Sequence, residues 1–189
     1  MLWRTGVILD LLEGGDSLFI IESDAIWLSD PGVYLEKYSG CDFVAGNDRV
    51  TKVKQAECGF IFLNNTVGII QLWNELYEKL QKNWVLVNQG NSGASKIVKA
   101  KRLGRLNEMV LFNNLLSENR FKNEGEKLSE CWLPISDFPN GLWYQGKVDS
   151  DNPVVIQNNY IKGNDRKIER AKKFGHWFLG VDDECVIRK

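Results

Sequence analysis

Two carboxylates follow an apolar segment near the start of the chain, in the stretch "FIIESDAIWLSDP". Glu22 and Asp24 are two positions apart, and side chains at that spacing point to the same side of an extended strand. At the carboxyl end of a strand in an open α/β sheet, such side chains face the crevice where ligands bind. Two hard oxygen donors there favour Mg²⁺ or Mn²⁺ bound together with substrate phosphates. The pair therefore predicts a site that handles phosphate groups.

Two other interpretations of these acids stay open. Glu22 and Asp24 would simply cap a turn and face water if they behaved as most charged residues do. A phosphatase or nuclease would also use carboxylates with a metal, but those chemistries need more carboxylates clustered at the metals than the sequence offers near this pair.

The elements that position the acids are predicted from apolar periodicity. Helices are expected over residues 2–12, 65–82 and 106–116, with a short one near Tyr34 and a solvated one from Asp165 to Lys173. The continuous apolar run "SLFII" predicts a fully buried strand. The other expected strands are "CDFVAG", "ECGFIFLN", "LSECWLPI" and "PVVIQ". Strands alternating with helices predict an α/β fold with a mainly parallel sheet, in which the strand that precedes the acids is central.

Composition limits the partners of this chain. Its 189 residues include 24 basic and 25 acidic side chains, with a formal net charge of -1. Because neither sign dominates, no nucleic acid and no anionic membrane surface is predicted as a partner. The longest apolar runs are far shorter than the roughly 20 residues that cross a bilayer, so no membrane span is predicted. A hydrophobic content of 43% is enough for one sizeable core, and residues 1–189 are expected to form a single domain.

The cysteines leave the compartment open. Cys41, Cys58, Cys131 and Cys185 are widely spaced and include no Cys-x-x-Cys pair, which argues against a zinc site. Four cysteines permit disulfides in any of three pairings, but four unpaired buried thiols would give the same pattern.

Several stretches together resemble one protein family. "ESDAIWLSDP" is similar to the Asp-x-Asp-containing segment of the nucleotide-diphospho-sugar transferases, which include rhamnogalacturonan α-xylosyltransferases and related glycosyltransferases. The stretches "ECGFIFLNNT", "NEMVLFNNLL", "LPISDFPNG" and "PVVIQNNYIKGNDRKIERAKKFGHWFL" resemble further family blocks in the same order. The similarity runs from about Gly15 to Leu179, and several blocks in the right order are more specific than any single block.

The resemblance implies a GT-A-type fold, with a mainly parallel sheet flanked by helices. It implies transfer of a sugar, a pentose or hexose, with retention of configuration from a nucleotide-diphosphate donor to a glycan or glycoprotein acceptor. The cofactor would be Mn²⁺ or Mg²⁺, and the compartment would be the secretory pathway, in the Golgi lumen.

Carried over residue by residue, the resemblance also implies a site. Asp24 would bind the metal that bridges the donor diphosphate, and Glu22 would lie toward the ribose and the water shell of the metal. Glu108 would be a catalytic residue near the sugar that orients the donor sugar or stabilises the transition state electrostatically, although an ordinary exposed helix residue is equally compatible with its pattern. Gly59 and Phe60 would lie on a strand that passes close to the donor, where a missing side chain lets a ligand approach, although packing also explains them.

This chain departs from the family pattern in two ways that matter for transferase activity. Many relatives carry a histidine as a further metal ligand where this chain has Gln157, and a neutral amide oxygen binds Mn²⁺ more weakly than imidazole does. The lone histidine, His176, is expected to be structural or on the surface. Relatives also have further strand-helix units before the helix that opens this chain. The chain is therefore expected to be an N-terminally truncated transferase domain, or alternatively a degenerate, inactive transferase fold that acts as a binding or scaffold module.

Overall fold

A computed structural model describes residues 2–47, 54–88, 106–119, 127–180 and 184 of the chain. The chain divides into two compact units. The first unit comprises Met1–Ile21 and Gly32–Leu133, and the second comprises Glu22–Pro31 and Pro134–Lys189. A ten-residue segment that carries Glu22 and Asp24 therefore belongs with the C-terminal part of the chain. The interpretation of residues 1–189 as one transferase domain stays a prediction.

The first unit contains a four-stranded mixed sheet. Its strands are β1 (Leu18–Ile21), β3 (Phe43–Asn47), β4 (Ala56–Leu63) and β5 (Glu130–Trp132), and they pair in the order β1-β4-β3-β5. β4 runs antiparallel to both of its neighbours, whereas β5 runs parallel to β3.

The α/β class is as predicted, but the strand directions differ from the mainly parallel sheet expected. β3 ends at Asn47 and β4 begins at Ala56, which leaves too few residues for the crossover of a dozen or more that a parallel pair needs. β1 is half-buried rather than fully buried, and it lies at the edge of the described sheet rather than at its centre. An apolar run indicates that the faces of a strand pack against other parts of the protein. It does not indicate how many strands pair with that strand.

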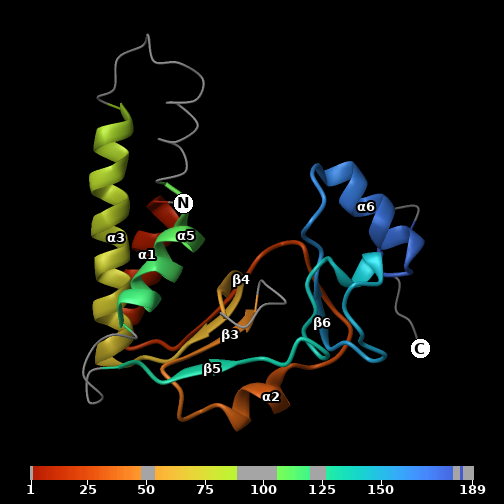
Figure 1. Cartoon of the computed structure of the whole chain (residues 1–189), viewed down its shortest axis with the longest axis horizontal. Coiled ribbons are helices and arrows are strands. Elements are labelled where there is room, and N and C mark those ends of the chain that lie inside the picture. Colours follow the sequence, from red (N-terminus) through yellow and green to blue (C-terminus); the bar gives the residue numbers. More distant parts are fainter. Residues whose placement is uncertain (1, 48–53, 89–105, 120–126, 181–183, 185–189) are drawn as a thin grey trace. The chain divides into compact units, whose positions relative to one another are not determined.

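Three helices pack together in the first unit: α1 (Leu2–Glu13), α3 (Val67–Asn88) and α5 (Glu108–Asn119), which Figure 1 shows side by side. Their apolar faces meet residues of β3 and β4 in one core, where Phe43, Trp73 and Phe112 are fully or almost fully buried. The Trp73 indole nitrogen donates to the Thr5 carbonyl oxygen at 3.1 Å, which ties α3 to α1. α2 (Gly32–Lys37) is the short helix expected near Tyr34.

A disulfide lies in the first unit. Cys41, just before β3, is bonded to Cys131 in β5, so the covalent link crosses the parallel strand pair. This selects one pair among those that the sequence allowed. The Cys58 side chain and Cys185 lie outside what the structure describes.

The second unit is built around a two-stranded antiparallel ribbon of β2 (Ala25–Trp27) and β6 (Val155–Gln157). The short 3₁₀ helix η2 (Trp143–Gln145) and the helix α6 (Asn164–Lys173) are the other regular elements among its described residues. β2 was not predicted, because its three residues follow an acidic turn and carry no alternation of their own. In the described parts of both units, no helix combines the length and apolar character needed to cross a bilayer.

Candidate functional site

The acidic pair lies in a turn rather than on a strand. β1 ends at Ile21, and the Ala25 amide donates to the Glu22 carbonyl oxygen at 3.1 Å, closing a tight turn that leads into β2. The expectation that Glu22 and Asp24 share one side of a continuing strand is therefore wrong in its geometry. The two carboxylates converge because both contact the same side chain.

That partner is Gln157, at the end of β6. The β2–β6 register places Gln157 opposite Ala25, one residue from Asp24. The Asn158 amide then donates to the Asp24 carbonyl oxygen at 3.0 Å, which fixes the two segments against each other. The Gln157 side-chain nitrogen Nε2 lies 3.0 Å from Oδ1 of Asp24 and 3.4 Å from Oε2 of Glu22. Two carboxylates thus meet at one buried amide.

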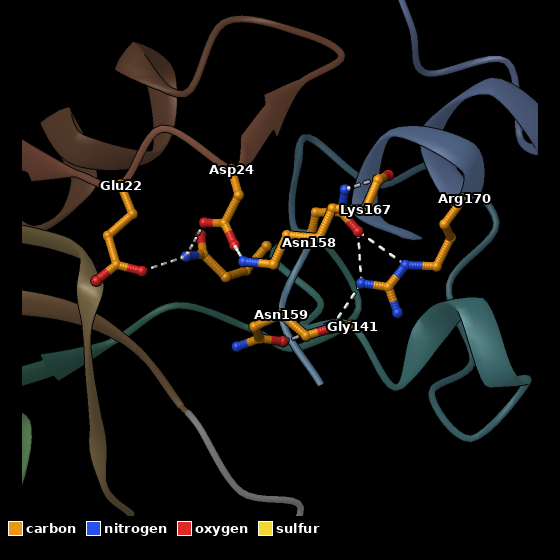
Figure 2. A network of polar contacts seen from close by, with 8 residues as sticks. Glu22, Asp24, Gly141, Asn158, Asn159, Lys167 and Arg170 are labelled. Carbon is orange, nitrogen blue, oxygen red and sulfur yellow. Dashed lines mark hydrogen bonds and ion pairs between the residues drawn. The ribbon is translucent and has the colours of Figure 1, made fainter. Parts of the chain in front are cut away.

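The other oxygen of Asp24 has a cationic partner. The Lys167 ammonium group, from α6, forms an ion pair with Oδ2 of Asp24. The pair is partly shielded from water, since the Asp24 side chain is 14% exposed and that of Lys167 27% exposed. Figure 2 shows Glu22, Asp24 and Lys167 within one network of polar contacts. A lysine here supplies the counter-charge that a buried carboxylate needs.

Arg170, one turn along α6, fixes the backbone around the site. Its Nε donates to Oδ1 of buried Asn158 at 2.8 Å, and its Nη2 donates to the same oxygen and to the Asn159 carbonyl oxygen at 2.6 Å. The side-chain nitrogen Nδ2 of Asn158 donates to the Lys167 backbone carbonyl oxygen at 3.1 Å. Asn159 in turn accepts a hydrogen bond from the Gly141 amide at 2.7 Å (Figure 2). The network holds the end of β6 against α6.

Gly141 has to be glycine at this place. A Cβ atom built on it would lie 2.0 Å from the Asn159 carbonyl oxygen, much closer than any real contact. The "FPNG" stretch therefore keeps its glycine because two backbone segments touch there.

A cavity of about 560 Å³ opens beside the acidic pair within the second unit. Asp24 and Lys167 both line it, and so do aromatic side chains of β2 and of the segment after α6. Its volume falls within the range of about 300–1,000 Å³ that is usual for small-molecule pockets.

Known proteins resemble this chain over most of its length. The family model for nucleotide-diphospho-sugar transferases matches residues 1–171. The chain belongs to this family. It is 26% identical over 196 residues to UDP-D-xylose:L-fucose alpha-1,3-D-xylosyltransferase 1 of Arabidopsis thaliana, covering 95% of this chain and 49% of that protein. It is also 26% identical over 191 residues to UDP-galactose:fucoside alpha-3-galactosyltransferase of Dictyostelium discoideum, covering 96% of this chain and 28% of that protein. The chain thus spans about half the length of the Arabidopsis relative, and less of the Dictyostelium protein.

The donor set of this transferase-family chain fits a hard divalent cation. Carboxylate oxygens of Glu22 and Asp24 meet at the Gln157 amide, whose own oxygen Oε1 is buried and has no hydrogen-bond partner among the described residues. Half a turn of the amide group exchanges its nitrogen and oxygen, and would direct a third oxygen at the carboxylates. In the described part of the chain no three or more His, Cys, Asp or Glu residues cluster as metal ligands, so the amide is needed to complete this set.

Glu108 is buried in the first unit, at 2% exposure, rather than exposed on a helix. Its Oε1 accepts from Nη2 of Arg4 at 2.8 Å, and its Oε2 accepts from Nε of Arg4 at 3.3 Å and from the Thr5 hydroxyl at 3.4 Å. These contacts join α5 to α1, which is a structural role. A catalytic role for Glu108 stays a prediction.

Gly59 is buried within β4, and Phe60 packs edge-on against Phe19 of β1 with 5.0 Å between ring centroids. These contacts are those of sheet packing. A place for either residue beside a donor stays a prediction.

His176 is held by aromatic neighbours. Its ring stacks on that of Trp143, with 5.6 Å between centroids, and its Nδ1 lies 3.0 Å from the Tyr144 hydroxyl oxygen. Burial raises the pKa of Tyr144 to about 12, although the charge of Arg170, 4.4 Å from the ring centroid, acts in the opposite direction. Tyr144 therefore keeps its proton to higher pH than a free tyrosine does. The structural interpretation of His176 fits these contacts.

Sequence reasoning missed Lys167 and Arg170. Both were assigned to a solvated helix, yet both are only half-exposed and face Asp24 and Asn158. Their separation of three residues, which puts them on one face of a helix, was the available signal.

Proposed function

We propose that this chain carries the metal and diphosphate side of a glycosyltransferase that moves a sugar from a nucleotide-diphosphate donor. The observation that carries the proposal is the convergence of Glu22 and Asp24 on the buried Gln157 side chain, in a chain of the nucleotide-diphospho-sugar transferase family. Oxygen donors of this kind suit Mn²⁺ or Mg²⁺.

The names of the relatives support a more specific substrate pair. They use UDP-D-xylose or UDP-galactose as donor, and L-fucose or a fucoside as acceptor. We extend this to a UDP-linked pentose or hexose as donor and a fucose-bearing glycan or glycoprotein as acceptor. The alpha linkage in the relatives' names supports transfer with retention, because common UDP-sugars carry the alpha configuration.

The roles of the residues follow from their contacts. Asp24 and Glu22 would hold the cation through carboxylate oxygens, with Gln157 as a weaker neutral ligand. The bound metal would act as a Lewis acid that stabilises the charge developing on the leaving diphosphate. Lys167 neutralises Asp24 and, when a cation takes over that task, has an ammonium group available for a phosphate oxygen. Arg170 positions Asn158 and the end of β6.

The disulfide supports a place in the secretory pathway, such as the Golgi lumen. Cys41 and Cys131 are bonded within the first unit, and such bonds persist in oxidising compartments.

A binding or scaffold module is the second candidate. It is favoured by Lys167, which already balances the charge of Asp24, and by Gln157, which is a poor ligand compared with histidine. In that case the fold would be retained and donor binding would be lost.

Calorimetric titration separates the two functions. The chain is titrated with UDP-D-xylose and UDP-galactose in Mn²⁺, and product formation on a fucoside acceptor is followed by mass spectrometry. If the chain is a transferase, we expect a measurable heat of UDP-sugar binding in the wild type. The exposed control Asp149→Asn should give the same heat, and Asp24→Asn should give none. No heat from a folded wild-type chain with any donor would overturn donor binding and favour the module.

A further inference from the structure

The turn between β4 and α3 carries a modification motif. Asn64, Asn65 and Thr66 follow the end of β4 at Leu63 and precede the start of α3 at Val67. The order Asn-x-Thr, with a residue other than proline in the middle, is the acceptor motif for N-linked glycosylation. It occurs once among the 189 residues of the chain. Acceptors of this kind lie in surface loops, so the position of the motif fits its use.

Thr66 also has a structural task. Its hydroxyl group donates to Oδ1 of Asp42 at 2.6 Å and accepts from the Ile69 amide at 3.3 Å, which caps the first turn of α3. These contacts explain the threonine without any modification. The choice between a structural motif and an acceptor motif therefore depends on Asn64.

The side-chain nitrogen Nδ2 of Asn64 has two N–H groups, and its two contacts lie in different surroundings. One is a partly buried hydrogen bond to the Cys41 carbonyl oxygen. The other is an exposed contact of 3.4 Å with the Ser39 carbonyl oxygen, near the limit of hydrogen bonding. A sugar replaces only one hydrogen of an amide nitrogen. The exposed N–H can therefore be exchanged for a glycan while the contact with Cys41 is kept.

The surface around this exposed contact is open. Ser39 and Gly40 are both exposed, and a Cβ atom built on Gly40 would meet nothing within 4 Å among the described residues. Val67, directly after the motif, is 72% exposed although it is apolar. A bulky hydrophilic group therefore has room at this turn.

The disulfide links this turn to an oxidising compartment. Cys41, whose carbonyl oxygen accepts from Asn64, is itself bonded to Cys131. Disulfides persist in the secretory pathway, and N-linked glycans are found on secreted proteins. Both features therefore indicate the same compartment.

From these features we propose that Asn64 carries an N-linked oligosaccharide. The donor is an oligosaccharide on a polyprenyl diphosphate, and a membrane-bound oligosaccharyltransferase catalyses the transfer. A bond forms between Nδ2 of Asn64 and the anomeric carbon of the first sugar. The bond from that carbon to a diphosphate oxygen breaks, the diphosphate leaves with the electron pair, and Nδ2 loses one proton. The proposal rests on the proposed place in the secretory pathway and does not depend on donor binding by this chain.

Expression with a secretory signal peptide in a mammalian cell line tests the proposal. A C-terminal tag carries an acceptor motif of its own, and its glycan shows that a chain has entered the endoplasmic reticulum. The secreted wild type should show two electrophoretic mobility shifts that peptide N-glycosidase removes. Asn64→Gln and Thr66→Val should each lose one shift. Asn65→Gln and Thr66→Ser keep the motif and should retain both shifts.

Mass spectrometry of the wild type covers the case in which a variant does not fold. Peptide N-glycosidase converts a glycosylated asparagine into aspartate. Digestion of the secreted wild type in H₂¹⁸O should therefore leave an ¹⁸O-labelled aspartate in place of Asn64.

A secreted chain with a glycosylated tag and an unmodified Asn64 would overturn the proposal. A glycan on Asn64 that occurs only in chains retained in the cell would overturn it too, because that glycan would be incompatible with the fold. Neither result bears on the transferase proposal, which the titration with UDP-sugars tests separately.

Discussion

Lys167 of α6 pairs its ammonium group with the Asp24 carboxylate, within reach of the amide that also contacts Glu22. A lysine thus carries the counter-charge at the place where the transferase account puts a metal. The Lys167 ammonium group and a bound metal ion would compete for the Asp24 carboxylate, and this competition can be measured.

Replacing Lys167 with methionine tests that competition. Lys167→Met leaves Asp24 partly buried without its cationic partner, and we expect it to lower the free energy of unfolding by about 1.5–3 kcal/mol, the usual value of a hydrogen bond to a charged group. Mn²⁺ should restore part of this loss, because a ligand that binds only the folded state stabilises it. Urea denaturation with and without Mn²⁺ measures both effects. If Mn²⁺ restored the double variant with Asp24→Asn equally well, Asp24 would not be the ligand.

Gln157→His tests the third ligand. Imidazole binds Mn²⁺ better than an amide oxygen does, so we expect the variant to bind Mn²⁺ about 10-fold more tightly, at the lower end of the changes seen around metal sites. Electron paramagnetic resonance of unbound Mn²⁺ gives the affinity. Gln145→His adds a histidine at an exposed position of η2 and controls for weak surface binding. Equal affinities of the wild type and Gln157→His for Mn²⁺ would show that residue 157 is not a metal ligand.

Glu108→Gln distinguishes structure from catalysis. Its carboxylate accepts three hydrogen bonds from Arg4 and Thr5, and we expect the variant to lose about 1.5–3 kcal/mol of unfolding free energy. Glu118→Gln, on the same helix but with a side chain that is 62% exposed, should cost less than about 1 kcal/mol. Urea denaturation of both variants is the measurement. A Glu108→Gln chain as stable as the wild type but unable to transfer sugar would show that Glu108 is catalytic.

Tyr144 makes stability fall at alkaline pH. Burial raises its pKa from 10.0 to about 12, so the unfolded chain releases this proton near pH 10 while the folded chain retains it. The stabilisation from Tyr144 is therefore complete below pH 10 and is lost as the pH rises toward 12. Tyr144→Phe lacks this proton, and its stability should fall less steeply over that window. Parallel unfolding curves for the two chains against pH would contradict the assignment.

The sequence predicted the elements better than their arrangement. Apolar periodicity located α1, α3 and α5, because each has a continuous face that must be buried. It did not predict that β1 is an edge strand, since pairing depends on contacts far along the chain. β2 is too short to leave a pattern, and its place depends on β6, some 130 residues later.

For the site, too, the sequence predicted the residue types better than their arrangement. The types of Glu22 and Asp24 indicated metal chemistry, but their convergence depends on Gln157, which the β2–β6 register brings opposite Ala25. Lys167 was missed because a charged residue on a polar helix looks solvated until the helix has been placed. Glu108 was predicted to be a catalytic residue, with an exposed helix position as the alternative, and its burial depends on its contacts with Arg4 and Thr5 of α1.

The most direct test of the central claim is the binding of Mn²⁺ to the folded chain in the presence of UDP, followed by electron paramagnetic resonance for the wild type, Asp24→Asn and the exposed control Asp149→Asn. The account predicts that the wild type and Asp149→Asn bind Mn²⁺ alike, and that Asp24→Asn binds it at least about 10-fold more weakly. Equal binding by all three folded proteins would contradict the assignment of Asp24 to a metal-diphosphate site.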